Sequence, residues 1–294
     1  MPLSRRTLIG SSLAAATAVA VRPAQAAANV LRIGISTSLN TLDPMMVTTG
    51  DEYIYTNLVF NGLARMREDL TVEPDLAESW SYSDDLKRWT FRLRRGVKFH
   101  DGQEMVADDV VASFRRLLDP AGTSPVRSQY DMVESVSAPD AATVVFQLTI
   151  PYGGLADILT DRQVKIVPRS ATALATQPIG TGPFKFVSYT AGDRLVLARH
   201  AGYFESGLPK VDGVELRIIP EMSVKIAALQ AGDIEVLWDL PLEQVKALSG
   251  RAELRVDSVP TASWDGAILN NDIPPFNDKR VRQAFHLAVD KKEI

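Results

Sequence analysis

The chain has no cysteine and only three histidines among its 294 residues. Without cysteine it can form no disulfide bond, thiolate nucleophile, thiolate metal site or lipid anchor on an amino-terminal cysteine. The histidines His100, His200 and His286 are far apart in the sequence and stand in unlike contexts. We therefore expect no metal site built from them, and we interpret His100 as a turn residue.

Motifs of common catalytic sites are also missing. The sequence has no Gly-x-Ser-x-Gly elbow, no His-Glu-x-x-His pair and no Walker loop. Acidic residues are abundant, but no pair of them stands out from an ordinary solvated surface. These absences predict a protein that is not an enzyme, uses no cofactor and binds without chemistry.

The charge balance excludes a nucleic-acid partner. Lysine and arginine total 32, aspartate and glutamate total 36, and the two signs are interspersed, so there is no basic field. The composition is 46% hydrophobic and 23% charged, as in ordinary soluble globular proteins. A chain of this length can bury a sizeable core, and about two domains are expected.

The first residues have the pattern of an export signal. Arg5 and Arg6 precede an apolar, alanine-rich run at 8–21, and Ala24-Gln25-Ala26 is typical of a cleavage site. The run is too short to span a membrane. The arginine pair resembles a twin-arginine signal, although ordinary Sec signals also carry such pairs. We expect cleavage near residue 27 or 29 and a periplasmic mature protein.

Residues 72–120 contain the clearest periodicity. Trp89, Phe91 and Leu93 alternate with polar residues, which predicts a half-buried strand. After a turn, Val110 and Phe114 fall on one face of a predicted helix. Elsewhere the patterns predict strands at 31–35, 144–148, 184–189, 195–199, 214–218 and 264–269, and helices at 53–63, 155–159, 222–229, 242–248 and from Asn277 or Asp278 onward.

Three stretches carry a resemblance to a known family. They are PDLAESW followed by WTFRLRRGVKFHDG and ADDVVASFRRLLDP, then IGTGPFKF, and then LNNDIPPFNDKRVRQAFHLAVDKKEI. Together they resemble the bacterial extracellular solute-binding proteins of the peptide/nickel class, family 5, which deliver ligands to ABC transporters. The family usually has threonine as the cap where this chain has Val106, and a lost capping hydroxyl costs about 1 kcal/mol.

The resemblance implies an α/β periplasmic-binding-protein fold of the type II, clamshell kind. Its first lobe is expected to be nearly complete and its second lobe mostly missing, as in a chain truncated at its carboxyl end. The expected divisions are a signal peptide at 1–28, a discontinuous first-lobe core at 29–48 and 180–270, an inserted subdomain at 49–179, and the start of the second lobe at 271–294. The last helix is expected to leave its apolar face uncovered.

The resemblance also places a ligand cleft at loops that follow strands. Arg162 is either a carboxylate-binding residue or an ordinary surface arginine. Trp238 lines an apolar pocket or packs in the core, and Asn270-Asn271 is also read as a hinge. The candidate ligand-binding residues are Thr37, Ser38, Leu39, Asn40, Arg162, Gln163, Trp238, Asp239, Asn270 and Asn271.

Gly180 and Gly182 could suggest a phosphate loop, but a third glycine and a following helix are absent, and Pro183 leads into a strand. We predict instead a tight chain crossing between lobes, where glycine permits a close backbone approach.

The implied function is the periplasmic substrate-binding component of an ABC importer. The expected partners are a peptide or related small solute and the membrane permease, with the protein itself a monomer. Two alternatives stay open: a non-functional or transporter-independent peptide-binding fragment, and a secreted hydrolase, which would need a catalytic constellation.

Overall fold

The computed structural model describes residues 29–258 and 267–290, so the predicted signal peptide lies outside the described residues. The chain forms two compact units. The larger one runs to Arg65 and then from Val72 to Leu240, and the smaller one comprises Met66–Thr71 and Pro241–Ile294. Among the residues that the structure describes, no helix is long and apolar enough to cross a bilayer.

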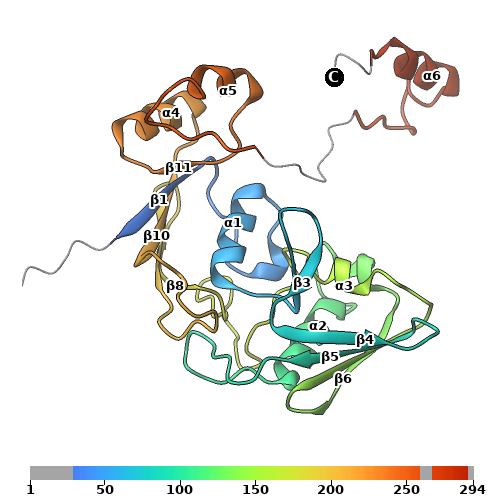
Figure 1. Ribbon diagram of the computed structural model, residues 1–294. Helices are drawn as coiled ribbons and strands as arrows, with labels where there is room; N and C mark the ends of the chain where they lie inside the picture. The colour runs from blue at the N-terminus through green and yellow to red at the C-terminus, as the bar shows by residue number, and fades with distance from the viewer. Residues whose placement is uncertain (1–28, 259–266, 291–294) are drawn as a thin grey trace, which may run out of the picture. The chain divides into compact units, whose positions relative to one another are not determined.

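The larger unit holds a five-stranded and a four-stranded sheet with helices packed on them (Figure 1), and β2 pairs with β3 in a separate two-stranded sheet. Its elements, in chain order, are β1 (Val30–Ile35), η1 (Pro44–Met46), α1 (Gly50–Val59), β2 (Ala64–Met66), β3 (Val72–Pro74), β4 (Ala77–Tyr82), β5 (Arg88–Leu93), α2 (Ala107–Leu118), η2 (Arg127–Tyr130), β6 (Val133–Asp140), β7 (Thr143–Leu148), α3 (Leu155–Ile158), β8 (Phe184–Thr190), β9 (Arg194–Arg199), β10 (Gly213–Ile218), α4 (Met222–Ala231) and β11 (Val236–Leu237).

The first sheet has the strand order β11-β1-β10-β9-β8. β1 runs parallel to β10 and β11, while β10, β9 and β8 pair antiparallel, so that the predicted strands at 184–189 and 195–199 form a hairpin. Ile33 and Ile35 join a buried cluster with Tyr55 and Val59 of α1. Because side chains alternate along a strand, Gly34 faces the other side of the sheet, where the side chain of Lys225 from α4 packs over it.

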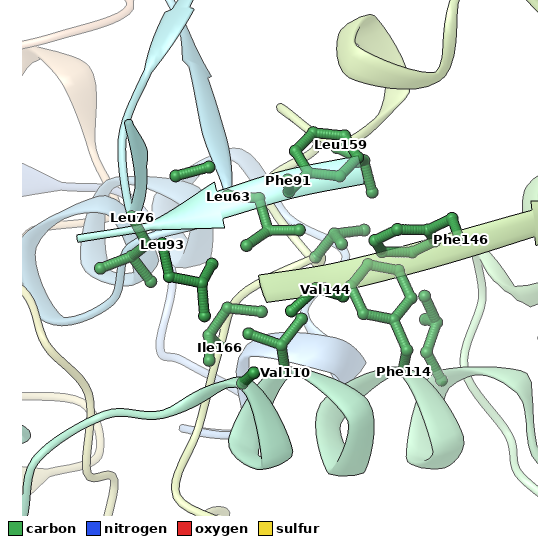
Figure 2. Packing of buried hydrophobic residues seen from close by; sticks show 14 of the residues in the cluster. Leu63, Leu76, Phe91, Leu93, Val110, Phe114, Val144, Phe146, Leu159 and Ile166 are labelled. Carbon is green, nitrogen blue, oxygen red and sulfur yellow. The ribbon is translucent and has the colours of Figure 1, made fainter. Parts of the chain in front are cut away.

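The second sheet has the strand order β4-β5-β7-β6 and is antiparallel throughout. The predicted alternation of β5 is confirmed, since Trp89, Phe91 and Leu93 are all at most 3% exposed. Figure 2 shows Val110 and Phe114 of α2 pointing towards β7, where the ring of Phe114 meets that of Phe146 edge to face at 4.8 Å between centroids. The amphipathic face of α2 thus covers this sheet.

The two sheets draw on different parts of the chain. The strands of the first come from 30–35 and 184–237, and those of the second from 77–148. Figure 1 shows α1 between them. The division into a first-lobe core, an inserted subdomain and a second lobe from residue 271 stays a prediction.

The amino terminus of α2 lacks a side-chain cap, as the valine at position 106 predicted. Val106 makes no capping hydrogen bond, and the helix begins at Ala107. The Asp109 carboxylate accepts a hydrogen bond from the Val106 N–H at 3.0 Å. A carboxylate in the first turn therefore supplies one half of a capping box without the usual hydroxyl.

The predicted close backbone approach at the Gly-x-Gly segment is confirmed. The Gly182 N–H donates to the Val59 carbonyl at 2.9 Å, at the end of α1. A Cβ on Gly180 would lie 2.1 Å from that carbonyl oxygen, and a Cβ on Gly182 would lie 2.5 Å from the Val59 carbonyl carbon. Only a residue without a side chain lets the two backbone segments touch.

Two of the three histidines, although far apart in the sequence, lie next to each other in the structure. The rings of His100 and His200 lie 4.9 Å apart, edge to face. His100 Nδ1 accepts from the Gly180 N–H, while its Nε2 and the Nδ1 of His200 both donate to the Gly182 carbonyl. Sequence spacing could not reveal this, because the crossing segment brings the two turns together. No group of three potential metal ligands occurs in the described part of the chain.

The pH dependence of folding should report this histidine contact. Burial lowers the pKa of His100 to about 4, from an ordinary value of 6.5. The unfolded chain then binds more protons between these values, so stability is lost as the pH falls. We expect the advantage of the wild type over His100→Gln to shrink by about 2 kcal/mol between pH 7 and pH 5.

Urea unfolding of both proteins across this pH range measures the difference. Burial raises the pKa of Asp75 to about 6, which acts in the opposite direction. That contribution is common to both proteins and cancels in the comparison. A difference that does not change with pH would show that His100 is not held neutral.

One predicted helix has different ends, and one predicted strand is not formed in the part that the structure describes. The helix expected at 53–63 begins at Gly50 and ends at Val59, because Thr49 caps it and Phe60 is already extended. The strand expected at 264–269 is not formed at 267–269, and its other residues lie outside the described chain. In the smaller unit, the predicted helices are present as α5 (Leu242–Leu248) and α6 (Lys279–Ala288).

The apolar face of α6 is exposed, as expected. Of the residues predicted to form this face, Phe285 is 42% exposed, Ala288 is also exposed, and Val281 is half-buried. Asp278 caps this helix by accepting from the Arg280 N–H.

Candidate ligand-binding site

The candidate site is built around the first turn of α1, whose side chains contact several loops. Thr49 and Glu52 form a capping box, and Glu52 is fully buried. Its carboxylate accepts three backbone hydrogen bonds, from Asn40 at 2.8 Å, Thr48 at 2.7 Å and Thr49 at 2.9 Å. One side chain therefore ties the loop after β1 to the start of the helix.

Asp51 makes a second and different set of contacts. Its Oδ2 accepts from the backbone N–H groups of Ser36 at 3.0 Å and Thr37 at 2.7 Å, and from the Thr37 hydroxyl at 2.8 Å. Its Oδ1 accepts from the indole Nε1–H of Trp238 at 2.9 Å. Asp51 thus joins the loop after β1 to the end of β11.

A buried lysine supports the same loop from the other side. Lys225 of α4 has no exposed surface, and its Nζ donates to the Ser36 hydroxyl at 2.5 Å. Its alkyl chain lies over Gly34 beside Ile234, and a Cβ on Gly34 would meet Ile234 Cδ1 at 2.7 Å. Ser36 therefore contacts both side chains: its hydroxyl accepts from Lys225, and its backbone N–H donates to Asp51.

Arg162 and Gln163, far away in the sequence, also lie against the start of α1. The guanidinium of Arg162 is 4.0 Å from the ring centroid of Tyr53, a cation–π contact. Gln163 is buried, and its Nε2 donates to the Val47 carbonyl at 2.7 Å. Burial raises the pKa of the Tyr53 hydroxyl, and the nearby Arg162 charge opposes this shift.

The remaining candidates divide into two groups. Ser38 Oγ accepts from the Gly192 N–H at 3.0 Å, and Leu39 is buried in the cluster beneath the first sheet. Asp239 follows Trp238 with a positive φ of 59° and is exposed. Asn270 and Asn271 belong to the smaller unit, where both are exposed.

Sequence reasoning missed Asp51, Glu52 and Lys225. A signal for the first two was present, because Thr49-x-x-Glu52 has the capping-box pattern and marks a helix start at residue 50. Lys225 carries no such signal. A lysine on a surface helix is normally solvated, and its burial here arises from the tertiary packing of α4 against β1.

The arrangement provides groups suited to recognition. The oxygens of Asp51 and Glu52 accept hydrogen bonds from internal donors. The exposed groups around the turn include the side chains of Thr37, Asn40 and Arg162, together with part of the Trp238 indole. Hydroxyl, amide, guanidinium and aromatic surfaces can bind a small polar solute.

The sequence model of the family "Bacterial extracellular solute-binding proteins, family 5 Middle" matches residues 71–294. The chain belongs to this family. Among curated relatives, the glutathione-binding protein GsiB of Salmonella typhimurium is 27% identical over 289 residues, which cover 97% of this chain and 56% of the relative. The chain therefore spans just over half the length of this relative.

Two solved structures of similar proteins have the same fold. MoaA of A. tumefaciens R10, in complex with mannopinic acid, is 29% identical with a TM-score of 0.79, covering 91% of this chain and 56% of that one. The oligopeptide-binding protein AppA of Bacillus subtilis, in complex with a nonapeptide, is 29% identical with a TM-score of 0.77, covering 90% and 54%. The family 5 chain thus has the α/β fold of periplasmic binding proteins.

Proposed function

We propose that this family 5 protein is the substrate-binding component of an ABC importer. It binds a peptide or a related small solute between two lobes and delivers it to a membrane permease. The observation that carries the proposal is the convergence of three segments, 36–40, 162–163 and 238, on residues 47–53 at the start of α1. Relatives described as binding glutathione, mannopinic acid and a nonapeptide support this solute class.

We infer the ligand contacts from the same convergence. Thr37, Asn40, Arg162 and Trp238 meet the solute, because their side chains are exposed or half-buried at the turn. Ser38, Leu39 and Gln163 do not contact the solute; their internal contacts fix the loops that carry the contacting residues. Asp239 lines the rim, and Asn270 and Asn271 belong to the hinge and the second lobe.

We also infer the place of action. The arginine pair and the apolar run at the amino terminus support export by a cleavable signal, of the twin-arginine type, to the periplasm. The protein acts there as a monomer, without catalysis or a cofactor. Its partners are the solute and the permease subunits.

Solute binding tests the proposal directly. Native mass spectrometry of the protein from its own periplasm should show the mature amino terminus and a small-molecule adduct. Isothermal titration of the purified chain with reduced glutathione, a dipeptide panel and a nonapeptide should give saturable binding, and Trp238→Ala should weaken it at least tenfold.

A matched control uses an aromatic residue away from the turn. Tyr82 of β4 is 58% exposed, so Tyr82→Ala should leave solute affinity unchanged. The absence of any adduct, together with no binding across the panel, would refute the proposed function.

A further inference from the structure

We propose that Asp51 is a positioning residue, and that it orients Trp238 so that the site selects solutes with an apolar side group. The inference rests on the proposed function, because it concerns the recognition surface of the same site. It assigns a role to a carboxylate that does not itself meet the solute.

The two oxygens of Asp51 have separate tasks. Oδ2 takes three donors from Ser36 and Thr37, which anchors the loop after β1. Oδ1 takes one donor, the indole N–H of Trp238 at 2.9 Å. Asp51 is only 4% exposed, so water competes poorly for this hydrogen bond.

Gly50 fixes the same edge of the indole. A Cβ on Gly50 would lie 2.6 Å from Cη2 of Trp238 and 3.2 Å from its Cζ2. These atoms and Nε1 lie along one edge of the ring system. That edge is therefore held against the first turn of α1 at two points, by a hydrogen bond and by packing on a residue without a side chain.

The orientation determines what the indole offers a solute. Its N–H is the only hydrogen-bond donor of the side chain, and Asp51 already occupies it. The surface left to a ligand consists of ring carbon, which favours apolar contact. Thr37, Asn40 and Arg162 supply polar groups around the turn, so an apolar side group on a polar backbone fits the set.

Asp51→Asn separates the two tasks of Asp51. The single amide oxygen should take the place of Oδ2, where three donors converge, and the amide NH₂ would then face the indole N–H. Two donors would oppose each other, and Trp238 would lose its acceptor while the loop stayed anchored. Trp238→Phe removes the indole donor and keeps an aromatic ring.

The solute-free arm of the test uses NMR. The Trp238 indole N–H resonance, assigned by its loss in Trp238→Phe, should be shifted downfield and exchange slowly in the wild type. In Asp51→Asn it should move upfield and exchange at least tenfold faster. An unchanged resonance would overturn the positioning role, whatever the protein binds.

The solute arm compares Ala-Leu with Ala-Ser and Ala-Lys by titration calorimetry. The wild type should bind Ala-Leu at least tenfold more tightly than the other two. Asp51→Asn, Trp238→Phe and the double variant should each reduce this preference by a similar factor, because the two residues act as one unit. A preference for Ala-Lys would overturn the inference. So would a double variant in which the reduction of the preference equals the product of the two single reductions, because the residues would then act independently.

The two arms also separate this inference from the proposed function. If no dipeptide binds the wild type, the selectivity claim fails; the proposed function fails with it only when glutathione and the nonapeptide do not bind either and no adduct is found. The NMR result still decides whether Asp51 positions Trp238. If dipeptides bind without a preference that depends on Asp51, the proposed function stands and the inference fails.

Discussion

Replacing Gly180 with alanine is expected to destabilise the larger unit by about 3–5 kcal/mol. The new Cβ would lie 2.1 Å from the Val59 carbonyl oxygen and 2.6 Å from a ring carbon of Phe60. The first of these is backbone and cannot rotate away. The end of α1 and the crossing segment must then separate, which breaks the hydrogen bond from Gly182 to Val59.

Urea unfolding followed by circular dichroism measures this loss. Gly153→Ala is the matched control, because its Cβ would meet only the Leu86 side chain at an ordinary 3.7 Å. We expect that variant to stay within about 1 kcal/mol of the wild type. If Gly180→Ala were as stable as Gly153→Ala, the backbone contact that defines the crossing would be absent.

Replacing Glu52 with alanine is expected to cost about 2–4 kcal/mol and to weaken solute binding. Three backbone N–H groups, of Asn40, Thr48 and Thr49, lose their acceptor at once. Asn40 and Thr48 are exposed enough for water to replace part of the loss, which keeps the cost below that of three fully buried donors. The loop that presents Thr37 and Asn40 should become mobile.

Urea unfolding measures the loss of stability, and hydrogen exchange of residues 36–49 measures the mobility of the loop. Titration calorimetry measures the weaker solute binding. Asp108→Ala removes another first-turn carboxylate, one that is exposed and pairs with Arg169 at the surface. We expect that control to change stability by less than about 0.5 kcal/mol. If Asp108→Ala and Glu52→Ala changed the unfolding free energy and the hydrogen exchange equally, Glu52 would act only as a negative charge near the amino terminus of its helix and not as a hydrogen-bond acceptor.

Periodicity predicted the elements whose hydrophobic pattern is strong. The alternation of Trp89, Phe91 and Leu93 predicted β5, and the apolar face of Val110 and Phe114 predicted α2. Both succeed because one face of each element must be buried, which imposes a period of 2 or 3.6 on the sequence. The start of α1 was misplaced, because its signal is the polar cap at Thr49 and not an apolar repeat.

The candidate site was predicted in part. The loop at 37–40 and Trp238 were named from the family resemblance, and the structure brings them to one helix turn. What connects them is the pair of acids Asp51 and Glu52, whose partners are backbone groups up to 15 residues away and an indole 187 residues away. No spacing rule links residues at such separations.

By itself, the sequence determined the elements with strong apolar periodicity, the glycine crossing and the family, because each depends on residues that are near one another in the chain. Only the tertiary structure decided that His100 meets His200, that Lys225 is buried under β1, and that Asp51 holds Trp238. These contacts arise where strands and loops distant in the sequence are packed together. Their geometry depends on how the sheets and helices fit, which a linear pattern does not contain.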